Sequence, residues 1–225
     1  MQVVQRFSRP SSGALEALKL VALAAMVADH ANKYALDKAY PAMEHVGRLA
    51  FPLFALVLAA NLRWNTADAR RYFMRLAGWG IASQAVYVWA TEDTQLNILL
   101  TLAVGVLLLL AVEALRQEVT AGRVLWLLVA LAATLPCDYT VTGPLLVLVF
   151  YAWFAWPGLA TGLLVIAGVA VLNRSTHFAP AALAALLVAC TALWWAPRLA
   201  RVTRHWFYPF YPIHLAAIRA AGTLL

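Results

Sequence analysis

The sequence predicts an all-α integral membrane protein, a single polytopic bundle of about nine transmembrane helices that forms one domain over residues 1–225. Three observations predict this class. Apolar residues make up 64% of the chain and charged residues only 12%. The mean hydropathy is +0.77. Apolar runs of up to about twenty residues recur almost to the last residue, which leaves no room for a soluble domain.

Glu16 and Lys19 interrupt the first apolar run of the chain, which argues against a cleaved signal peptide there.

Hydropathy and chain-breaking residues place the first four helices. Charged or polar segments separate each of these apolar runs from the next. The expected ranges, in order, are Leu15–Tyr34, Val46–Leu62, Arg71–Trp89 and Leu96–Leu115.

The second half of the chain contains shorter apolar runs. The first three are the shortest and fall well below the about 20 residues that cross a bilayer comfortably, so we expect them to tilt little, bend or pair as helical hairpins. The expected ranges are Val124–Leu135, Pro144–Trp156, Leu159–Asn173, Pro180–Trp195 and Trp206–Leu225.

Basic residues gather in alternate loops, and this predicts the orientation. Lys and Arg in a membrane protein mainly mark cytoplasmic loops, so the net charge of +7 does not imply nucleic acid. The other loops hold acidic residues or a single Arg174, with Lys33 and Lys38 as an exception. We therefore expect a cytosolic N-terminus and His30 in the outer half of the bilayer. The basic loops contain Arg6 and Arg9; Arg63, Arg70, Arg71 and Arg75; Arg116 and Arg123; and Arg198, Arg201 and Arg204.

The first helix carries ionisable residues that a membrane helix rarely tolerates. Lys19 and His30 are eleven residues apart, or about three full turns, so they share one helical face about 16 Å apart along the axis. His30 is a candidate general base, a proton-relay residue, or a histidine bonded only to backbone. Asp29 points about 100° away from His30 and is expected to pair with Lys33 or another helix. The carboxylate orienting His30 must then come from elsewhere, and Asp138 is the candidate.

Arg71 and Arg75 are four residues apart and share a helical face, with Arg63 and Arg70 nearby. Guanidinium groups suit phosphate oxygens, so the cluster is a candidate phosphate clamp. The alternative is a topology signal alone. Arg75 favours the clamp, because a topology signal needs no charge one turn inside the helix.

Other polar residues offer weaker signals. Glu44 and Arg48 have the spacing of a structural ion pair, although Arg48 also joins Tyr211 and His214 as a candidate substrate-binding residue. His214 lies deeper than the aromatic belt that explains Tyr208. His45 is expected to have no functional role, and His177 and His205 have no evident partner. Cys137 and Cys190 show no metal-ligand spacing, and we predict no metal site.

Several motifs together resemble the TraX family of bacterial inner-membrane proteins, which acetylate the N-terminus of conjugative F-type pilin. The matching order is collinear over nearly the whole chain. The segments are residues 17–23 (ALKLVAL), 26–33 (MVADHANK), 47–55 (GRLAFPLFA), 70–75, 97–102 (NILLTL), Asp138-Tyr139 and 210–215 (FYPIHL).

The chain also resembles the wider transmembrane acyltransferase type three superfamily. That family has a basic residue followed by ten residues and a histidine, here Lys19 and His30, and an Arg-x-x-x-Arg motif, here Arg71 and Arg75. A glycine expected soon after Asp138-Tyr139 is missing, unless Gly143 takes its place.

The resemblance implies transfer of an acetyl group from cytosolic acetyl-CoA to an acceptor outside, such as a pilin N-terminus, another exported peptide, a glycan or a lipid head group. It implies catalytic roles for His30, Asp29 and Asp138, and acetyl-CoA binding by Lys19, Arg63, Arg70, Arg71 and Arg75. Direct transfer and an acetyl-histidine intermediate both remain open.

Two other classes compete with an acetyltransferase. A proton-coupled transporter would use Asp29 and His30 as a relay, but it usually shows internal repeats, and none is clear here. A purely structural subunit is disfavoured by the many ionisable groups within or next to the spans.

Overall fold

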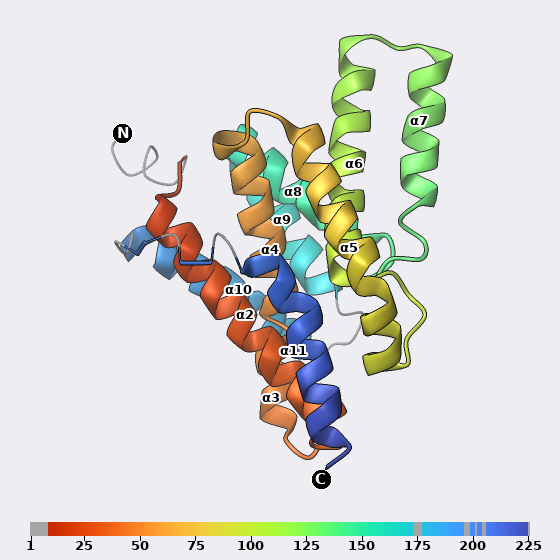
Figure 1. The fold of residues 1–225 in the computed structure, drawn as a ribbon. Helices are drawn as coiled ribbons and strands as arrows, with labels where there is room; N and C mark the ends of the chain where they lie inside the picture. Colours follow the sequence, from red (N-terminus) through yellow and green to blue (C-terminus); the bar gives the residue numbers. More distant parts are fainter. Residues whose placement is uncertain (1–8, 173–176, 196–198, 201, 204–205, 225) are drawn as a thin grey trace.

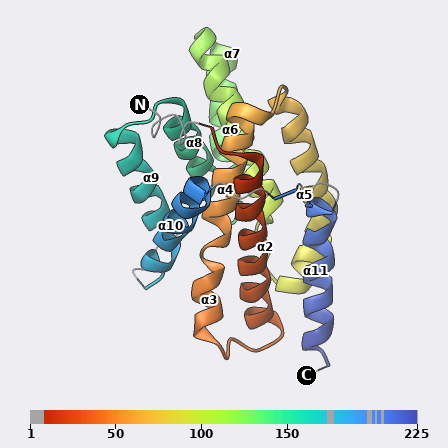
Figure 2. The ribbon, with the colours of Figure 1, turned by 90° about the vertical axis from the view of Figure 1, so that its left-hand side faces the viewer.

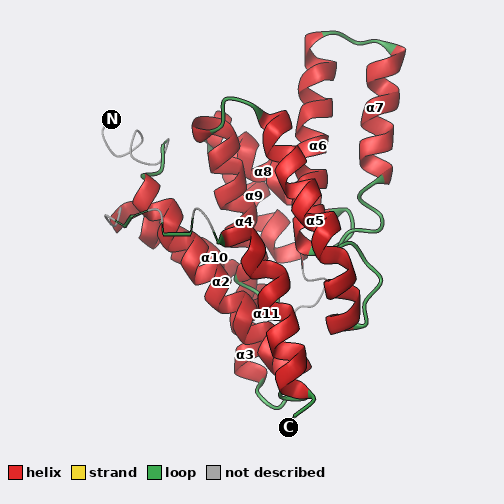
Figure 3. Ribbon diagram, in the orientation of Figure 1, coloured by secondary structure: helices red, strands yellow, loops and turns green. Residues whose placement is uncertain are grey.

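A computed structural model covers residues 1–225 and describes residues 9–172, 177–195, 199–200, 202–203 and 206–224. These residues form helices and turns, with one isolated bridge between Leu96 and Cys137 (Figure 3). Arg6, Arg174, Arg198, Arg201, Arg204 and His205, which entered the sequence predictions, lie outside the described residues. The all-α prediction is confirmed for the described part of the chain.

The helices follow the predicted order, with ends that mostly differ by one to three residues. α5 is capped by Asp68, whose side chain accepts bonds from the backbone N–H groups of Arg70 and Arg71. α6 is capped in the same way by Asn97. The elements are α2 (Ser12–Tyr34), α3 (Pro41–Gly47), α4 (Ala50–Ala60), the π-helix η1 (Asn61–Asn65), α5 (Ala69–Thr91), α6 (Ile98–Gln117), α7 (Ala121–Ala132), α8 (Thr142–Ala155), α9 (Leu159–Leu172), α10 (Ala179–Trp195) and α11 (Phe207–Gly222).

The second predicted helix is wrong in one respect. It begins five residues earlier, at Pro41, and a turn at Arg48 and Leu49 divides it into α3 and α4. Gly47 ends α3 where the backbone closely approaches Asp29 of α2, and a Cβ at Gly47 would overlap the Asp29 side chain. This approach depends on tertiary packing, so hydropathy could not reveal it.

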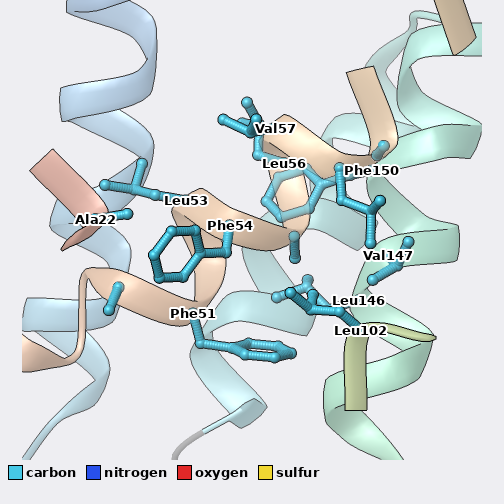
Figure 4. Close-up of a cluster of buried hydrophobic side chains, with 14 of the residues drawn as sticks. Ala22, Phe51, Leu53, Phe54, Leu56, Val57, Leu102, Leu146, Val147 and Phe150 are labelled. Carbon is cyan, nitrogen blue, oxygen red and sulfur yellow. The ribbon is translucent and has the colours of Figure 1, made fainter. Parts of the chain in front are cut away.

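All residues of α4 are buried. A helix that is apolar on every side belongs inside a bundle, and α4 packs against α2, α6, α8 and α10. Phe51, Phe54 and Leu56 of α4 meet Ala22 of α2 and Phe150 of α8 in the central apolar cluster (Figure 4).

α2 runs beside α4 and α11, while α6 and α7 form a hairpin that projects from one end (Figures 1 and 2). α5 contacts both α6 and α11. Buried Asn97 fixes the α5–α6 contact, because its Nδ2 donates to the Gly80 carbonyl over 2.7 Å. α2, α4, α5, α6 and α11 together surround the candidate site.

Within the described residues, two helical stretches are long and apolar enough to cross a membrane by length and composition, Pro41–Asn65 and Ile98–Gln117. Shorter apolar helices are Ala121–Ala132, Thr142–Ala155, Leu159–Leu172 and Ala179–Trp195. The bundle of about nine transmembrane helices therefore stays a prediction.

Candidate active site

Two polar cavities lie at the two ends of α2. The first, here called the Lys19 cavity, has a volume of about 250 Å³. It lies among α2, α4, η1, α5 and the segment before α11. Its polar lining consists of Ser12, Glu16, Lys19, Asn61, Asn65, Thr66, Tyr72, Arg75, Thr203 and Tyr208.

Lys19 does not project freely into this cavity. It pairs with Glu16 one turn away, and its Nζ donates to Thr203 Oγ1 over 2.6 Å. The buried Glu16 also accepts the Thr203 backbone N–H over 2.6 Å. Lys19 and Glu16 thus tie the segment before α11 to α2, and most of their bonding capacity is used within the chain.

The second cavity, here called the His30 cavity, has a volume of about 160 Å³. Three carboxylates and two cationic side chains line it, so its formal charge is −1 when all are ionised. These are Asp29, Asp93 and Asp138 against Lys33 and Arg48, and His30, Tyr34, Tyr87, Tyr139 and Tyr211 complete its polar wall.

His30 has a histidine as its neighbour, not a carboxylate. His30 Nδ1 lies 2.9 Å from Nε2 of His214 on α11. His214 Nδ1–H donates to the Phe210 carbonyl over 3.0 Å. The expectation that Asp138 orients His30 is therefore wrong for Nδ1, since His214 occupies that position.

Asp29 pairs with Lys33 as expected, because Lys33 Nζ donates to Asp29 Oδ2 over 2.6 Å. The other oxygen, Oδ1, is buried and has no hydrogen-bond partner. Gly47 leaves space for this carboxylate beside the α3–α4 turn. Asp29 therefore lines the His30 cavity with one carboxylate oxygen unpartnered and buried beside Gly47.

Asp138 lies in the turn between α7 and α8. The turn is held to the start of α6, because Asp138 N–H donates to the Leu96 carbonyl over 3.1 Å. Removal from solvent raises the pKa of Asp138 to about 6. Tyr139 and Thr140 adopt left-handed φ angles of 61° and 47°. Thr140 directly follows the Asp-Tyr pair, after which the resemblance predicts a glycine. Gly143 packs against the turn, and a Cβ there would lie 3.0 Å from the Asp138 carbonyl oxygen.

A narrow apolar space, here called the waist, lies between the two cavities. Its volume is about 20 Å³, enough for about one water molecule. It shares Phe54, Leu102 and Phe207 with the Lys19 cavity. It shares Phe54, Met26, Ile98 and Tyr211 with the His30 cavity, and Leu23 and Leu99 complete it. The two polar cavities are thus neighbours with an apolar constriction between them.

Beyond the His30 cavity lies another polar hollow of about 310 Å³. The two share Lys33 and Tyr34. Arg219 of α11 bonds Glu92 at the end of α5 over 2.7 Å in its wall. This hollow therefore adjoins the His30 cavity at these two side chains.

Comparison with known proteins identifies the family of this chain. The family described as TraX protein matches residues 14–220. The chain belongs to the TraX family. This TraX match includes every residue that lines the His30 cavity, and all those of the Lys19 cavity except Ser12.

The relatives are similar over most of their length. Protein TraX of Escherichia coli strain K12 is 32% identical over 219 residues, or 92% of this chain and 87% of the relative. Another Protein TraX from Escherichia coli is 32% identical over 226 residues, or 96% and 90%. The probable fimbrial assembly protein FimC, serogroup H1, of Dichelobacter nodosus is 28% identical over 240 residues, or 92% and 95%. No solved structure matches.

The structure brings most of the predicted TraX site residues to the two cavities. Lys19 and Arg75 line the first, and Asp29, His30, Arg48, Asp138 and Tyr211 line the second. His214 is buried behind His30 and does not line the cavity. Arg48 also makes the expected ion pair with Glu44, at 2.7 Å.

The rest of the arginine cluster lies elsewhere. Arg63, Arg70 and Arg71 are exposed and do not line the Lys19 cavity. Arg71 instead pairs with Asp68, and its side chain is 86% exposed. Because α5 turns by about 100° per residue, Arg70 points about 140° away from Arg75. Arg71 shares the face of Arg75 but lies in the first turn of α5, outside the cavity.

Sequence reasoning missed Asp93, Asn61 and Phe54. Asp93 follows α5 in a short loop, and only the return of the chain into α6 brings it to the cavity. Asn61 had a usable signal, since an amide directly after a fully apolar helix is uncommon without a polar partner.

Proposed function

We propose that this TraX-family chain is an integral, multi-pass acetyltransferase of the bacterial inner membrane with a cytosolic N-terminus. It moves acetyl from cytosolic acetyl-CoA to the amine of an exported peptide, with a pilin N-terminus as the favoured acceptor. One observation carries the proposal: a cavity with a cationic wall and a cavity with a histidine lie in one row, with only the waist between them.

The Lys19 cavity suits the cofactor end of acetyl-CoA. Arg75 supplies a guanidinium group, and Asn61, Asn65, Tyr72 and Tyr208 supply neutral donors. A guanidinium matches phosphate oxygens in charge and geometry. Arg75 is the principal phosphate ligand in this proposal, because Glu16 already neutralises Lys19.

The apolar waist suits the narrow pantetheine arm. Its small volume means that Phe54 and its neighbours must move aside when the arm enters. The thioester would then lie next to His30. The His30 ring accepts a proton from the attacking amine while the new C–N bond forms, and it returns the proton to the thiolate as the C–S bond breaks. The same ring could instead carry the acetyl group between two steps.

The carboxylates of the His30 cavity suit an amine acceptor. Asp29 Oδ1, Asp93 and Asp138 can attract an ammonium group and orient it before it loses its proton. The name of the Dichelobacter relative, a fimbrial assembly protein, supports a fibre subunit as the acceptor.

Sidedness separates this enzyme from a transporter. In oriented proteoliposomes, acetyl-CoA supplied on the Arg75 side should acetylate a peptide amine present only on the other side. CoA should stay on the donor side, and no ion gradient should be needed. Acetylation only when both substrates share a side contradicts transfer through the membrane. Movement of solute or protons without thioester consumption would favour the transporter that uses Asp29 and His30 as a relay.

His30→Ala tests the catalytic assignment. Loss of a general base lowers turnover by about 10²–10⁴-fold. The measurement is CoA release by purified protein under saturating substrates. His45→Ala is the matched control, since His45 is exposed and bonds the Pro41 carbonyl of its own helix. Equal turnover in the two variants would remove His30 from the mechanism.

Arg75→Ala tests the cofactor end. Loss of a charge-assisted phosphate contact should weaken acetyl-CoA binding by about 1.5–3 kcal/mol, with a smaller effect on acetyl-pantetheine. Arg71→Ala is the control one turn earlier, where the exposed side chain pairs with Asp68. Calorimetry that shows the same affinity for both variants and the parent protein would reassign Arg75 to topology.

A further inference from the structure

His214 is placed behind His30 by the packing of α11 against α2. The two residues are 184 positions apart in the chain, and the structure joins them through a single contact of 2.9 Å between His30 Nδ1 and His214 Nε2. His214 is only 6% exposed and does not line the His30 cavity. A residue in this place cannot touch an acceptor in the cavity, so the substrate-binding role expected for it does not fit.

The hydrogen bonds around His214 determine which nitrogen carries its proton. Its Nδ1 lies 3.0 Å from the Phe210 carbonyl, and a carbonyl can only accept. Nδ1 must therefore carry hydrogen. In the neutral ring, Nε2 then has a lone pair and accepts Nδ1–H of His30. His30 Nε2 is left as the unprotonated nitrogen.

The ring orientations agree with this pattern of donors. The planes of His30 and His214 differ by only 8°, with their centroids 5.1 Å apart. Because a ring N–H lies in the plane of its ring, nearly coplanar rings direct Nδ1–H of His30 toward the Nε2 lone pair. Phe210 stacks on His214 with 7° between planes and limits rotation of its ring.

We propose that His214 is a positioning residue that holds His30 in the tautomer whose Nε2 lone pair faces the reacting groups. The inference rests on the proposed acetyl transfer and assigns the reactive atom within it. The amine gives its proton to His30 Nε2 as its nitrogen bonds the thioester carbon. His30 Nε2–H then protonates the departing thiolate, so no net proton remains on the protein.

While His30 Nε2 holds the proton, the ring is cationic and His214 accepts a charge-assisted bond from Nδ1–H. His214 therefore stabilises the charged ring as well as its orientation. His30 is thus the base in the cavity, and His214 is the buried partner of its second nitrogen. The pair holds the His30 Nε2 lone pair available for a proton before substrate arrives.

Several charged and titratable groups face His30 from the elements packed around it, and all bear on its pH dependence. They are Asp29, Lys33 and Tyr34 of α2, Arg48 after α3, Tyr87 and Asp93 at the end of α5, Asp138 and Tyr139 in the turn before α8, and Tyr211 and His214 of α11. Substitution at His214 leaves all the others in place, so a change in the pH profile can be compared directly with the parent protein.

The kinetic test compares His214→Ala with His214→Gln. Alanine removes the acceptor from His30 Nδ1–H and should lower kcat by about 10–100-fold with little change in KM for acetyl-CoA. Glutamine offers a carbonyl oxygen to the same N–H and should restore much of kcat. The acidic limb of the pH–rate profile should move in His214→Ala and return toward the parent in His214→Gln. A histidine with a merely structural role would alter the amount of folded protein and leave that limb unchanged.

His45→Gln serves as the control, because His45 Nδ1 also contacts the carbonyl four residues earlier but lies outside the His30 cavity. If His214→Ala does not fold, His214→Leu keeps most of the bulk without an acceptor and should show the same shifted acidic limb. An unshifted limb in a folded variant that lacks the acceptor would overturn the proposal.

A measurement without turnover separates this inference from the proposed function. In ¹⁵N-histidine protein reconstituted in lipid, subtraction of the His30→Ala spectrum identifies the His30 signals. We expect a protonated Nδ1 and an unprotonated Nε2 in the parent, loss of this preference in His214→Ala, and its retention in His214→Gln. A protonated Nε2 in the parent would refute the tautomer assignment even if acetyl transfer is confirmed. If the spectrum is as expected but no acetyl transfer is detected, only the proposed function is refuted.

Discussion

The two ends of α2 carry similar ion pairs that are used differently. At the first end, Glu16 and Lys19 bond each other and Thr203, which ties the segment before α11 to the bundle. At the second end, Lys33 binds one oxygen of Asp29 and the other oxygen remains unpartnered at the His30 cavity. The first pair joins two segments, whereas the second leaves one carboxylate oxygen without a hydrogen-bond partner.

This difference shows that charge within an apolar helix does not by itself identify a binding group. Glu16 is 1% exposed, and its carboxylate is satisfied inside the protein. Asp29 is more accessible and has bonding capacity left. We therefore expect substitutions at Glu16 to act mainly on stability and substitutions at Asp29 mainly on activity.

The largest expected effect is that of Glu16→Ala on stability. Removal of one partner from a buried ion pair leaves the other charge unpaired and costs about 3–5 kcal/mol. Unfolding of purified protein in detergent measures this loss. Glu118→Ala is the control, because its pair with Arg123 is largely exposed and should contribute only about 0–1 kcal/mol. Equal losses of stability in the two variants would contradict the contrast between a buried ion pair and an exposed one.

Asp29→Asn should have a smaller effect and act on a different quantity. Loss of a charged acceptor for the amine should raise the activation free energy derived from kcat/KM for the peptide by about 1.5–3 kcal/mol. The affinity for acetyl-CoA should stay unchanged. Asparagine keeps the size of the side chain, so Gly47 and Lys33 can remain in place. A loss of stability as large as that of Glu16→Ala would show that Asp29, too, is mainly structural.

Gly47→Ala should have a still smaller effect, and it tests whether the position of the Asp29 carboxylate matters. The added methyl group overlaps the Asp29 side chain, and such overpacking costs about 1–3 kcal/mol in stability. It should also lower peptide turnover by moving the carboxylate. Gly78→Ala is the matched control in α5, since nothing lies within 4 Å of a Cβ there. Unchanged turnover in Gly47→Ala would mean that the position of Asp29 has no influence on catalysis.

Much of the fold could be predicted because apolar runs directly specify helices. The predicted and observed starts of α9 coincide at Leu159, and Tyr34 ends the first helix in both. The ion pairs Asp29–Lys33 and Glu44–Arg48 were also predictable, because residues four apart meet on one helical face. These are local relations that sequence spacing fixes.

The contacts that were missed join distant parts of the chain. Nothing in the local pattern of α2 indicates that His30 meets His214 or that Lys19 meets Thr203. Both pairs depend on how the last helix packs against the first. The break between α3 and α4 was missed for the same reason, since Gly47 is required by the approach of Asp29 from α2.

The waist has an electrical consequence if the bundle spans the membrane as proposed. Water in the cavities on both sides conducts ions, so most of the transmembrane voltage would fall across this short apolar section. A unit charge crossing 100 mV gains or loses about 2.3 kcal/mol. The pantetheine arm and the acetyl group are uncharged, whereas the proposed function keeps the charged phosphates beside Arg75, outside the waist. Acetyl delivery past Phe54 should therefore proceed at the same rate in energised and de-energised membranes.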